Sequence, residues 1–138
     1  MQLPSGLEIL EDREGCGPVA KIGDTVTYNV RIFLNRGDEV PMNEAQSKQG
    51  IPPDRLREEE NQILVDHMTP LGKRQAMAGT EKALVGMRAG GFRKVRFSPH
   101  LAYGSRGIPG LIPSDAVLTV HVWMRKVKAP SNAVEQTR

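Results

Sequence analysis

The segment from residue 98 to residue 116, SPHLAYGSRGIPGLIPSDA, most constrains what this chain can fold into. It contains three prolines and three glycines. Proline fixes φ and removes a backbone donor, while glycine allows positive φ, so the segment suits neither a helix nor a strand interior. It also carries Tyr103, Ile108, Leu111 and Ile112. Two interpretations stay open: one wall of a binding pocket, because loops on a rigid scaffold often carry function, or a loop that folds back onto its own core.

Alternating apolar residues predict strands on both sides of this segment. Residues 24–34, DTVTYNVRIFL, place five apolar side chains on one face and are rich in β-branched and aromatic residues. The turn signal Asn-Arg-Gly-Asp follows and predicts a hairpin. Residues 92–97 and 117–127 alternate in the same way. Shorter strands are predicted at residues 7–11, 39–41 and 63–65.

One helix is predicted after residue 79, where Ala83, Leu84 and Met87 share a face. Local capping rules make Thr80 the N-cap, and Gly90 with Gly91 is expected to stop the helix. Several strands, hairpin connections and one short helix indicate an α+β domain with an antiparallel sheet packed on the helix.

The middle of the chain is polar. Residues 41–62 contain Pro52 and Pro53, and Asp54 is a plausible N-cap for a short helix through Glu60. The segment is interpreted either as a mobile surface loop or as a cover or partner-binding arm. We expect one domain over residues 1–128, with residues 41–62 as a polar insertion and residues 129–138 as a disordered tail.

Composition argues against several classes of function. The net charge is +3, Lys and Arg are scattered and aromatics are 4% of the residues, so nucleic-acid binding has little support. No stretch is apolar enough for a membrane span, and no signal peptide is recognisable. The three histidines and Cys16 lack metal-ligand spacing, so neither a metal nor a cofactor is expected. A single cysteine fits a reducing compartment, and we expect a cytoplasmic monomer.

The runs SPHLAYG and GIPGLIP resemble the flap segment of FK506-binding-protein (FKBP) type peptidyl-prolyl isomerases. Residues 78–97 resemble that family's helix and following strand, residues 23–37 its long strand and turn, and residues 117–127 its last strand. The resemblance implies a twisted antiparallel half-barrel around one helix, with the helix starting a little before Thr80. It also implies isomerisation of Xaa-Pro bonds, assistance in protein folding, and partners that are proline-containing peptides or FK506-like macrolides.

The resemblance also implies a set of site residues. Tyr103 matches the flap tyrosine, and Met77 stands where a backbone N–H donor is expected. The pocket lining is expected from Val30, Val40, Ala76, Thr80, Ile108, Leu111, Ile112 and Val120.

Several of these positions depart from the family pattern. Val30, Val40, Thr80 and Val120 replace large, mostly aromatic residues, His67 falls near another aromatic position, and Pro41 replaces an aspartate for which Asp66 could stand in. Each loss removes tens of Å² of apolar contact, at about 25 cal/mol per Å². The sequence therefore predicts an isomerase with reduced or altered activity, or alternatively a non-catalytic FKBP-like module that binds a protein partner.

Overall fold

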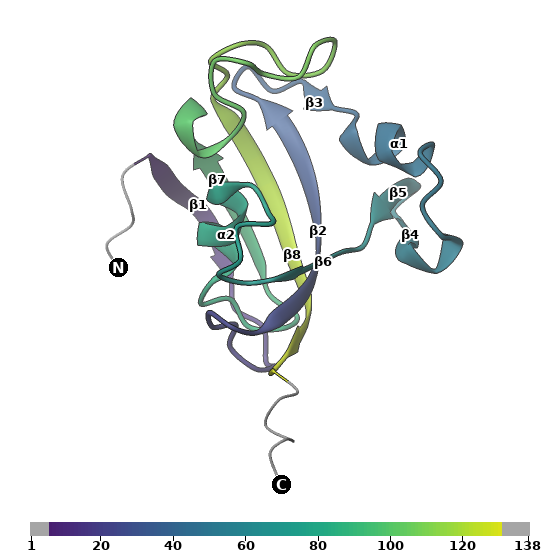
Figure 1. Ribbon diagram of the computed structural model, residues 1–138, viewed down its shortest axis with the longest axis vertical. Coiled ribbons are helices and arrows are strands. Elements are labelled where there is room, and N and C mark those ends of the chain that lie inside the picture. Colours follow the sequence, from purple (N-terminus) through teal and green to yellow (C-terminus); the bar gives the residue numbers. More distant parts are fainter. Residues whose placement is uncertain (1–5, 131–138) are drawn as a thin grey trace, which may run out of the picture.

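The computed structural model describes residues 6–130 and is built on one twisted antiparallel sheet (Figure 1). Its strands lie in the order β1-β7-β8-β2-β3, and β6 pairs with the start of β2. A short helix, α2, packs against one face, called here the inner face. The expected FKBP-like α+β fold is confirmed. The strand bounds are β1 Leu7–Arg13, β2 Thr25–Leu34, β3 Glu39–Val40, β6 His67–Pro70, β7 Phe92–Phe97 and β8 Leu118–Lys128.

The central pair of strands follows directly from the alternation in the sequence. β2 and β8 are antiparallel along their whole length, from Thr25 opposite Lys128 to Leu34 opposite Leu118. The alternate residues of both strands that point to the inner face are apolar, and they are buried together with residues of α2 and β7. This inner-face core includes Val26, Tyr28, Val30, Ile32, Ala83, Leu84, Val95, Phe97, Leu118, Val120, Val122 and Met124.

The helix starts earlier than local capping rules predict. α2 spans Ala78–Leu84 with Met77 as its N-cap, so Thr80 lies inside the first turn and is buried. The prediction of Thr80 as the N-cap is wrong, whereas the earlier start that the resemblance implies is confirmed. Tertiary packing overrides the capping preference here, because the burial of Gly79 and Thr80 places the first turn of the helix in the interior of the protein.

The helix also ends earlier than predicted. Gly86, at φ +91°, turns the chain two residues after Leu84, so Gly90 and Gly91 do not stop the helix. From β7, the buried guanidinium of Arg93 donates a hydrogen bond to the Ala83 carbonyl at 3.0 Å. This bond satisfies a carbonyl that the end of the helix would otherwise leave without a partner.

Residues 41–62 are folded rather than irregular, and the predicted helix over 54–60 is wrong. The chain forms a short helix and a two-stranded hairpin beside β2, on the side away from α2 (Figure 1). The hairpin is more favourable than the predicted helix, because it buries Leu64 and Val65 of its second strand, which a helix over its first strand would not allow. The elements are α1 Met42–Ser47, η1 Pro53–Arg55, β4 Leu56–Glu59 and β5 Gln62–Val65.

Two buried amide side chains attach this insertion to the sheet. Asn43 of α1 donates to the Val30 carbonyl at 2.8 Å and accepts from the Val65 amide at 3.0 Å. Asn29, with no exposed surface, donates to the Val65 carbonyl at 2.8 Å and accepts from Arg125 at 2.6 Å. Because both amides are satisfied on the oxygen and the nitrogen, their burial does not carry an unpaired polar group.

The edge of β2 is shared by two strands with a gap between them. β6 pairs with Thr25–Tyr28, and β3 pairs with Ile32 and Phe33. Asn43 bonds to Val30 within that gap. The insertion therefore begins after β3 and ends before β6, and its helix α1 covers the part of β2 that lies between these two strands.

Most of the predicted disordered tail, residues 131–138, lies outside the described residues. Within residues 6–130, no helix has the length and apolar character needed to cross a membrane.

The hairpin turn generates a stability prediction. Glu60 and Asn61 have φ of +50° and +65°, the left-handed values that a two-residue type I′ turn requires. Glutamate is disfavoured in that conformation, whereas asparagine tolerates it. Glu60→Asn should raise the free energy of unfolding by about 0.5–1 kcal/mol in urea titration. Glu58→Asn, in the extended part of β4, should give no gain. Equal or lower stability of Glu60→Asn would show that the turn is not strained.

Candidate functional site

The residues that the sequence predicts for a proline pocket gather on the inner side of the sheet. Four of them are buried in the main core: Val30, Val40, Ile112 and Val120. Four are partly exposed and pack against that core: Met77, Tyr103, Ile108 and Leu111. The other two, Thr80 and Ala76, are buried on α2 and half-buried just before it.

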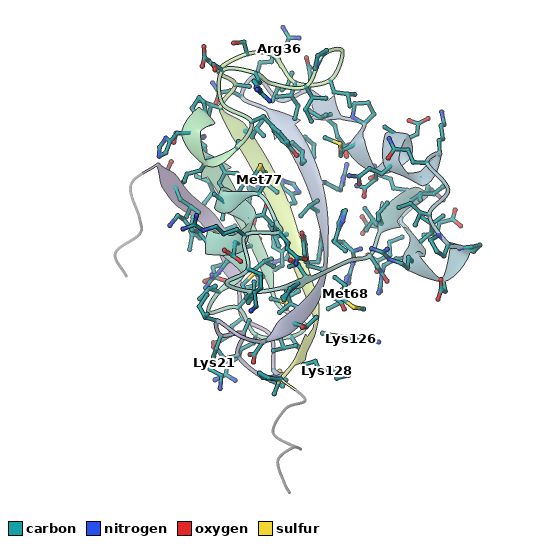
Figure 2. The ribbon with its side chains drawn as sticks, viewed as in Figure 1. Lys21, Arg36, Met68, Met77, Lys126 and Lys128 are labelled. Carbon is teal, nitrogen blue, oxygen red and sulfur yellow. The ribbon has the colours of Figure 1, made fainter. Side chains whose placement is uncertain are left out.

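The depth of these residues differs. Val120 has no exposed surface, so it lies beneath the site rather than on its surface. Val30, at 9% exposed, is the most accessible of the four core members. The surface that a ligand could touch is therefore formed mainly by Met77, Tyr103, Ile108 and Leu111. Figure 2 places Met77 between the start of α2 and the upper part of the sheet.

The proline- and glycine-rich loop is a compact, hydrogen-bonded structure. Pro109 and Gly110 occupy the tip of a tight turn, and Gly110 has φ +81°. Ile108 and Ile112 exchange two backbone hydrogen bonds of 2.8 Å across that turn. At the base of the loop, Gly104 accepts from the Asp115 amide at 2.9 Å. The turn therefore holds the apolar side chains of the loop in fixed positions against the core, as both interpretations of this segment require.

Two hydrogen-bond donors border this apolar surface. The Tyr103 side chain is partly buried, and burial raises the pKa of its phenol, so the hydroxyl keeps its proton at neutral pH. Within residues 6–130, no protein group accepts a hydrogen bond from the Tyr103 hydroxyl. In the same part of the chain, the Met77 backbone N–H is also without a protein acceptor. Both donors are therefore available to a ligand carbonyl.

Tyr28 was not among the predicted site residues. It lies on β2 two residues before Val30 and on the same buried face. Burial raises its pKa to about 12, and the electrostatic effect of Tyr103 acts in the same direction. The one sequence signal for Tyr28 was that it is the only aromatic residue on the inner face of its strand.

His67 supplies a second ring at this position. It stacks on Tyr28 with 5.3 Å between ring centroids and 28° between planes. Burial lowers the pKa of His67, the Arg55 charge lowers it further, and Asp66 opposes them. The neutral imidazole therefore acts as an aromatic wall behind Tyr28, as expected for a residue near an aromatic position of the family.

Asp66 does not stand in for the aspartate that Pro41 replaces. Its carboxylate accepts hydrogen bonds from Asn29 at 2.7 Å and from Arg57 at 2.9 Å. Burial would raise the pKa of Asp66, but these hydrogen bonds and the Arg57 charge outweigh it and hold the pKa below its usual value. Because Asn29 points to the outer face of the sheet, Asp66 belongs to the attachment of the insertion and not to the inner-face site.

The described residues offer no metal centre: within residues 6–130, no three His, Cys, Asp or Glu side chains gather closely enough to hold an ion. The site consists instead of apolar side chains, the Tyr28 and His67 rings, and two unengaged donors. This combination can grip an apolar ring and bind a carbonyl oxygen beside it.

Comparisons with known proteins point to one family. The family model described as FKBP-type peptidyl-prolyl cis-trans isomerase matches residues 17–124. FK506-binding protein 4 of Chaetomium thermophilum is 30% identical over 128 residues, which is 93% of this chain and 23% of that protein. An FK506-binding protein of Streptomyces anulatus is 31% identical over 120 residues, covering 85% of this chain and 83% of that protein.

The 46 kDa FK506-binding nuclear protein of Spodoptera frugiperda is 28% identical over 127 residues, or 92% of this chain. The chain spans about a quarter of the length of such long relatives, since it covers 23% and 27% of the Chaetomium and Spodoptera proteins. The family model, however, covers β2, α2, β7, the loop and most of β8, which form the site. The chain belongs to the FKBP-type peptidyl-prolyl cis-trans isomerase family.

Proposed function

We propose that this chain catalyses the cis-trans isomerisation of Xaa-Pro peptide bonds and thereby assists protein folding. The observation that carries the proposal is the pair of unengaged donors, the Tyr103 hydroxyl and the Met77 N–H, beside one apolar surface. The family match over residues 17–124 supports it.

The reaction needs no nucleophile, metal or acid–base pair. The uncatalysed bond rotates over tens to hundreds of seconds, because amide resonance imposes a barrier of about 18–20 kcal/mol. An apolar surface around the proline ring favours the twisted, less polar amide over the planar one. The Tyr103 hydroxyl and the Met77 N–H then bind carbonyl oxygens and hold the peptide in position while the bond turns.

The proposal includes altered activity. Val30, Val40, Thr80 and Val120 offer less apolar area than the aromatic residues that the family pattern places there, and each loss weakens proline binding by about 25 cal/mol per Å². Tyr28 and His67 restore part of an aromatic wall. We expect turnover below that of a full-motif relative, with a preference for bulkier residues beside the proline because the pocket is wider.

The proposal also covers the small-molecule ligand, the oligomeric state and the location of the protein. The names of the relatives refer to FK506, and we propose that the same surface binds FK506-like macrolides through their proline-like ring. A monomeric state and a cytoplasmic location are proposed from the sequence, the latter from the single cysteine.

The alternative is a non-catalytic protein-binding module. The loss of four pocket aromatics favours it, and so does the folded insertion, which adds a second surface beside the sheet. The two functions differ in whether the inner-face site engages proline.

One test of this proposal concerns the Tyr103 hydroxyl. Tyr103→Phe removes one donor and keeps the ring, so kcat/KM on an Xaa-Pro peptide should fall about two- to tenfold, the equivalent of one hydrogen bond. The measurement is NMR exchange or a protease-coupled assay. Ser47→Ala, which removes an exposed hydroxyl from α1, serves as the control. An unchanged kcat/KM in Tyr103→Phe would remove the hydroxyl from the mechanism.

A macrolide titration separates the two functions. With isotope-labelled protein, FK506 should shift the amide resonances of Met77, Tyr103 and Ile112, because these residues border the apolar surface. Resonances of β1, at the far edge of the sheet, provide the internal control. No change in the resonances of the three site residues would favour the binding module.

A further prediction concerns the dependence of stability on pH. Burial lowers the pKa of His67, so the folded state releases its proton more readily than the unfolded chain does. The unfolded state then binds more protons, and the free energy of unfolding should fall as the pH drops from about 8 through the unfolded value near 6.5.

His121 acts in the same direction, because burial and then Lys94 lower its pKa. The test is therefore urea unfolding of the parent, His67→Phe and His121→Phe at about pH 8, 6.5 and 5. Each variant should show a shallower pH dependence than the parent. A His67→Phe curve parallel to the parent would show that this histidine does not carry the effect.

A further inference from the structure

A groove of about 410 Å³ lies between the end of β3, helix α1 and the turn of the β4–β5 hairpin. It belongs to the insertion and is separate from the inner-face site. Polar and apolar side chains both line it, and they come from β3, from α1 with the residue before it, and from the hairpin. The lining residues are Glu39, Pro41, Asn43, Glu44, Asn61, Gln62 and Ile63.

The lining is anionic and suited to an extended peptide. Two of its residues are carboxylates and none is a cation. Ile63 is 48% exposed, a large apolar side chain that a ligand could cover. Asn61 and Gln62 add amide groups that match the donors and acceptors of a peptide backbone. The side chain of lysine or arginine, which has an aliphatic stem and a positive end, complements this combination.

The two carboxylates differ in availability. Glu39 receives two hydrogen bonds from Arg31, at 2.8 and 3.0 Å, and is held in place by them. Among the described residues, the Glu44 carboxylate has one ion pair, an exposed contact of 3.6 Å with Lys48, and its side chain is 70% exposed. Because an exposed pair of this kind is worth little, a ligand cation can replace Lys48 at Glu44.

The groove and the proline site share strand β3. Val40 of the site lies between Glu39 and Pro41, and neighbouring side chains of a strand point to opposite faces. Asn43, in the groove wall, donates to the carbonyl of Val30, another site residue. The two surfaces therefore meet at β3, and a peptide of about three to five extended residues, with a reach of about 10–18 Å, can pass over this strand.

We propose that this groove is a substrate-selecting subsite for peptides that carry lysine or arginine about three to five residues from the proline. The inference rests on the proposed function, because it assigns a substrate class to the same isomerase. The proline ring occupies the surface beside Tyr103, and the basic side chain reaches over β3 to Glu44.

The test compares two peptides that differ in one residue. Each holds one Ala-Pro bond, with either lysine or glutamine about four residues away, and versions with that residue before and after the proline are both made. Dissociation constants come from NMR titration of labelled protein. The lysine peptide should bind about two- to fivefold more tightly at low salt, and the preference should fade near 0.5 M salt. Amides of Gln62 and Ile63 should shift together with that of Tyr103.

Variants assign the preference to the groove. Glu44→Gln should abolish the difference between the lysine and glutamine peptides. Glu8→Gln is the matched control, since Glu8 also forms an exposed ion pair, with Arg96 at 3.1 Å, but lies on β1 at the opposite edge of the sheet. That variant should keep the parent's preference.

Failure of this inference differs from failure of the proposed function. Equal affinity of the two peptides at low salt, or a preference that survives Glu44→Gln, overturns the subsite while isomerisation of both peptides upholds the function. A glutamine peptide that neither shifts Tyr103 nor isomerises overturns the function. A lysine peptide that shifts the groove amides but not the amide of Tyr103 overturns the subsite, because one peptide would then not occupy both surfaces.

Discussion

The antiparallel pairing of β2 with β8 is the interaction on which the rest of the structure depends. Both strands present apolar side chains to α2 at every second position, and most of these are fully buried. A one-residue change in register would turn all of them toward solvent. At about 25 cal/mol per Å² of apolar surface, that loss would exceed the net stability of a domain this size. The loop, the helix and the insertion are all positioned relative to this pair.

Strong periodicity made the sheet predictable. β2, β7 and β8 appear in the sequence as clear alternation, and their bounds agree with the prediction to within one residue. The apolar pattern after residue 79 predicted α2, but its earlier start came from the family resemblance, because Met77, its N-cap, carries no capping signal of its own. β6 was not predicted, because its four residues, His67 to Pro70, are too few to show a period and end in a proline.

The insertion and the aromatic wall could not be predicted for a different reason. Met42 and Asn43 are buried by contacts with β2 and β5 that lie far away in the sequence. The alternation in β2 places Tyr28 on the buried face, but nothing in the strand pattern distinguishes a core residue from one that borders a site. Phe33, Phe92 and Trp123, half of the six Phe, Trp and Tyr residues, lie instead on the outer face and stack with His121 and with arginines. The low aromatic content near the site therefore reflects placement as well as composition.

The gap between β6 and β3 along β2 has a consequence for association between molecules. A free strand edge is a template on which another copy of a chain can add a strand, and this is a common route to aggregation. Here the Asn43 amide occupies the carbonyl of Val30, and α1 stands beside it. The edge is thereby divided into two short stretches that are already paired. The helix that carries the groove thereby blocks the addition of a further strand along this stretch of β2.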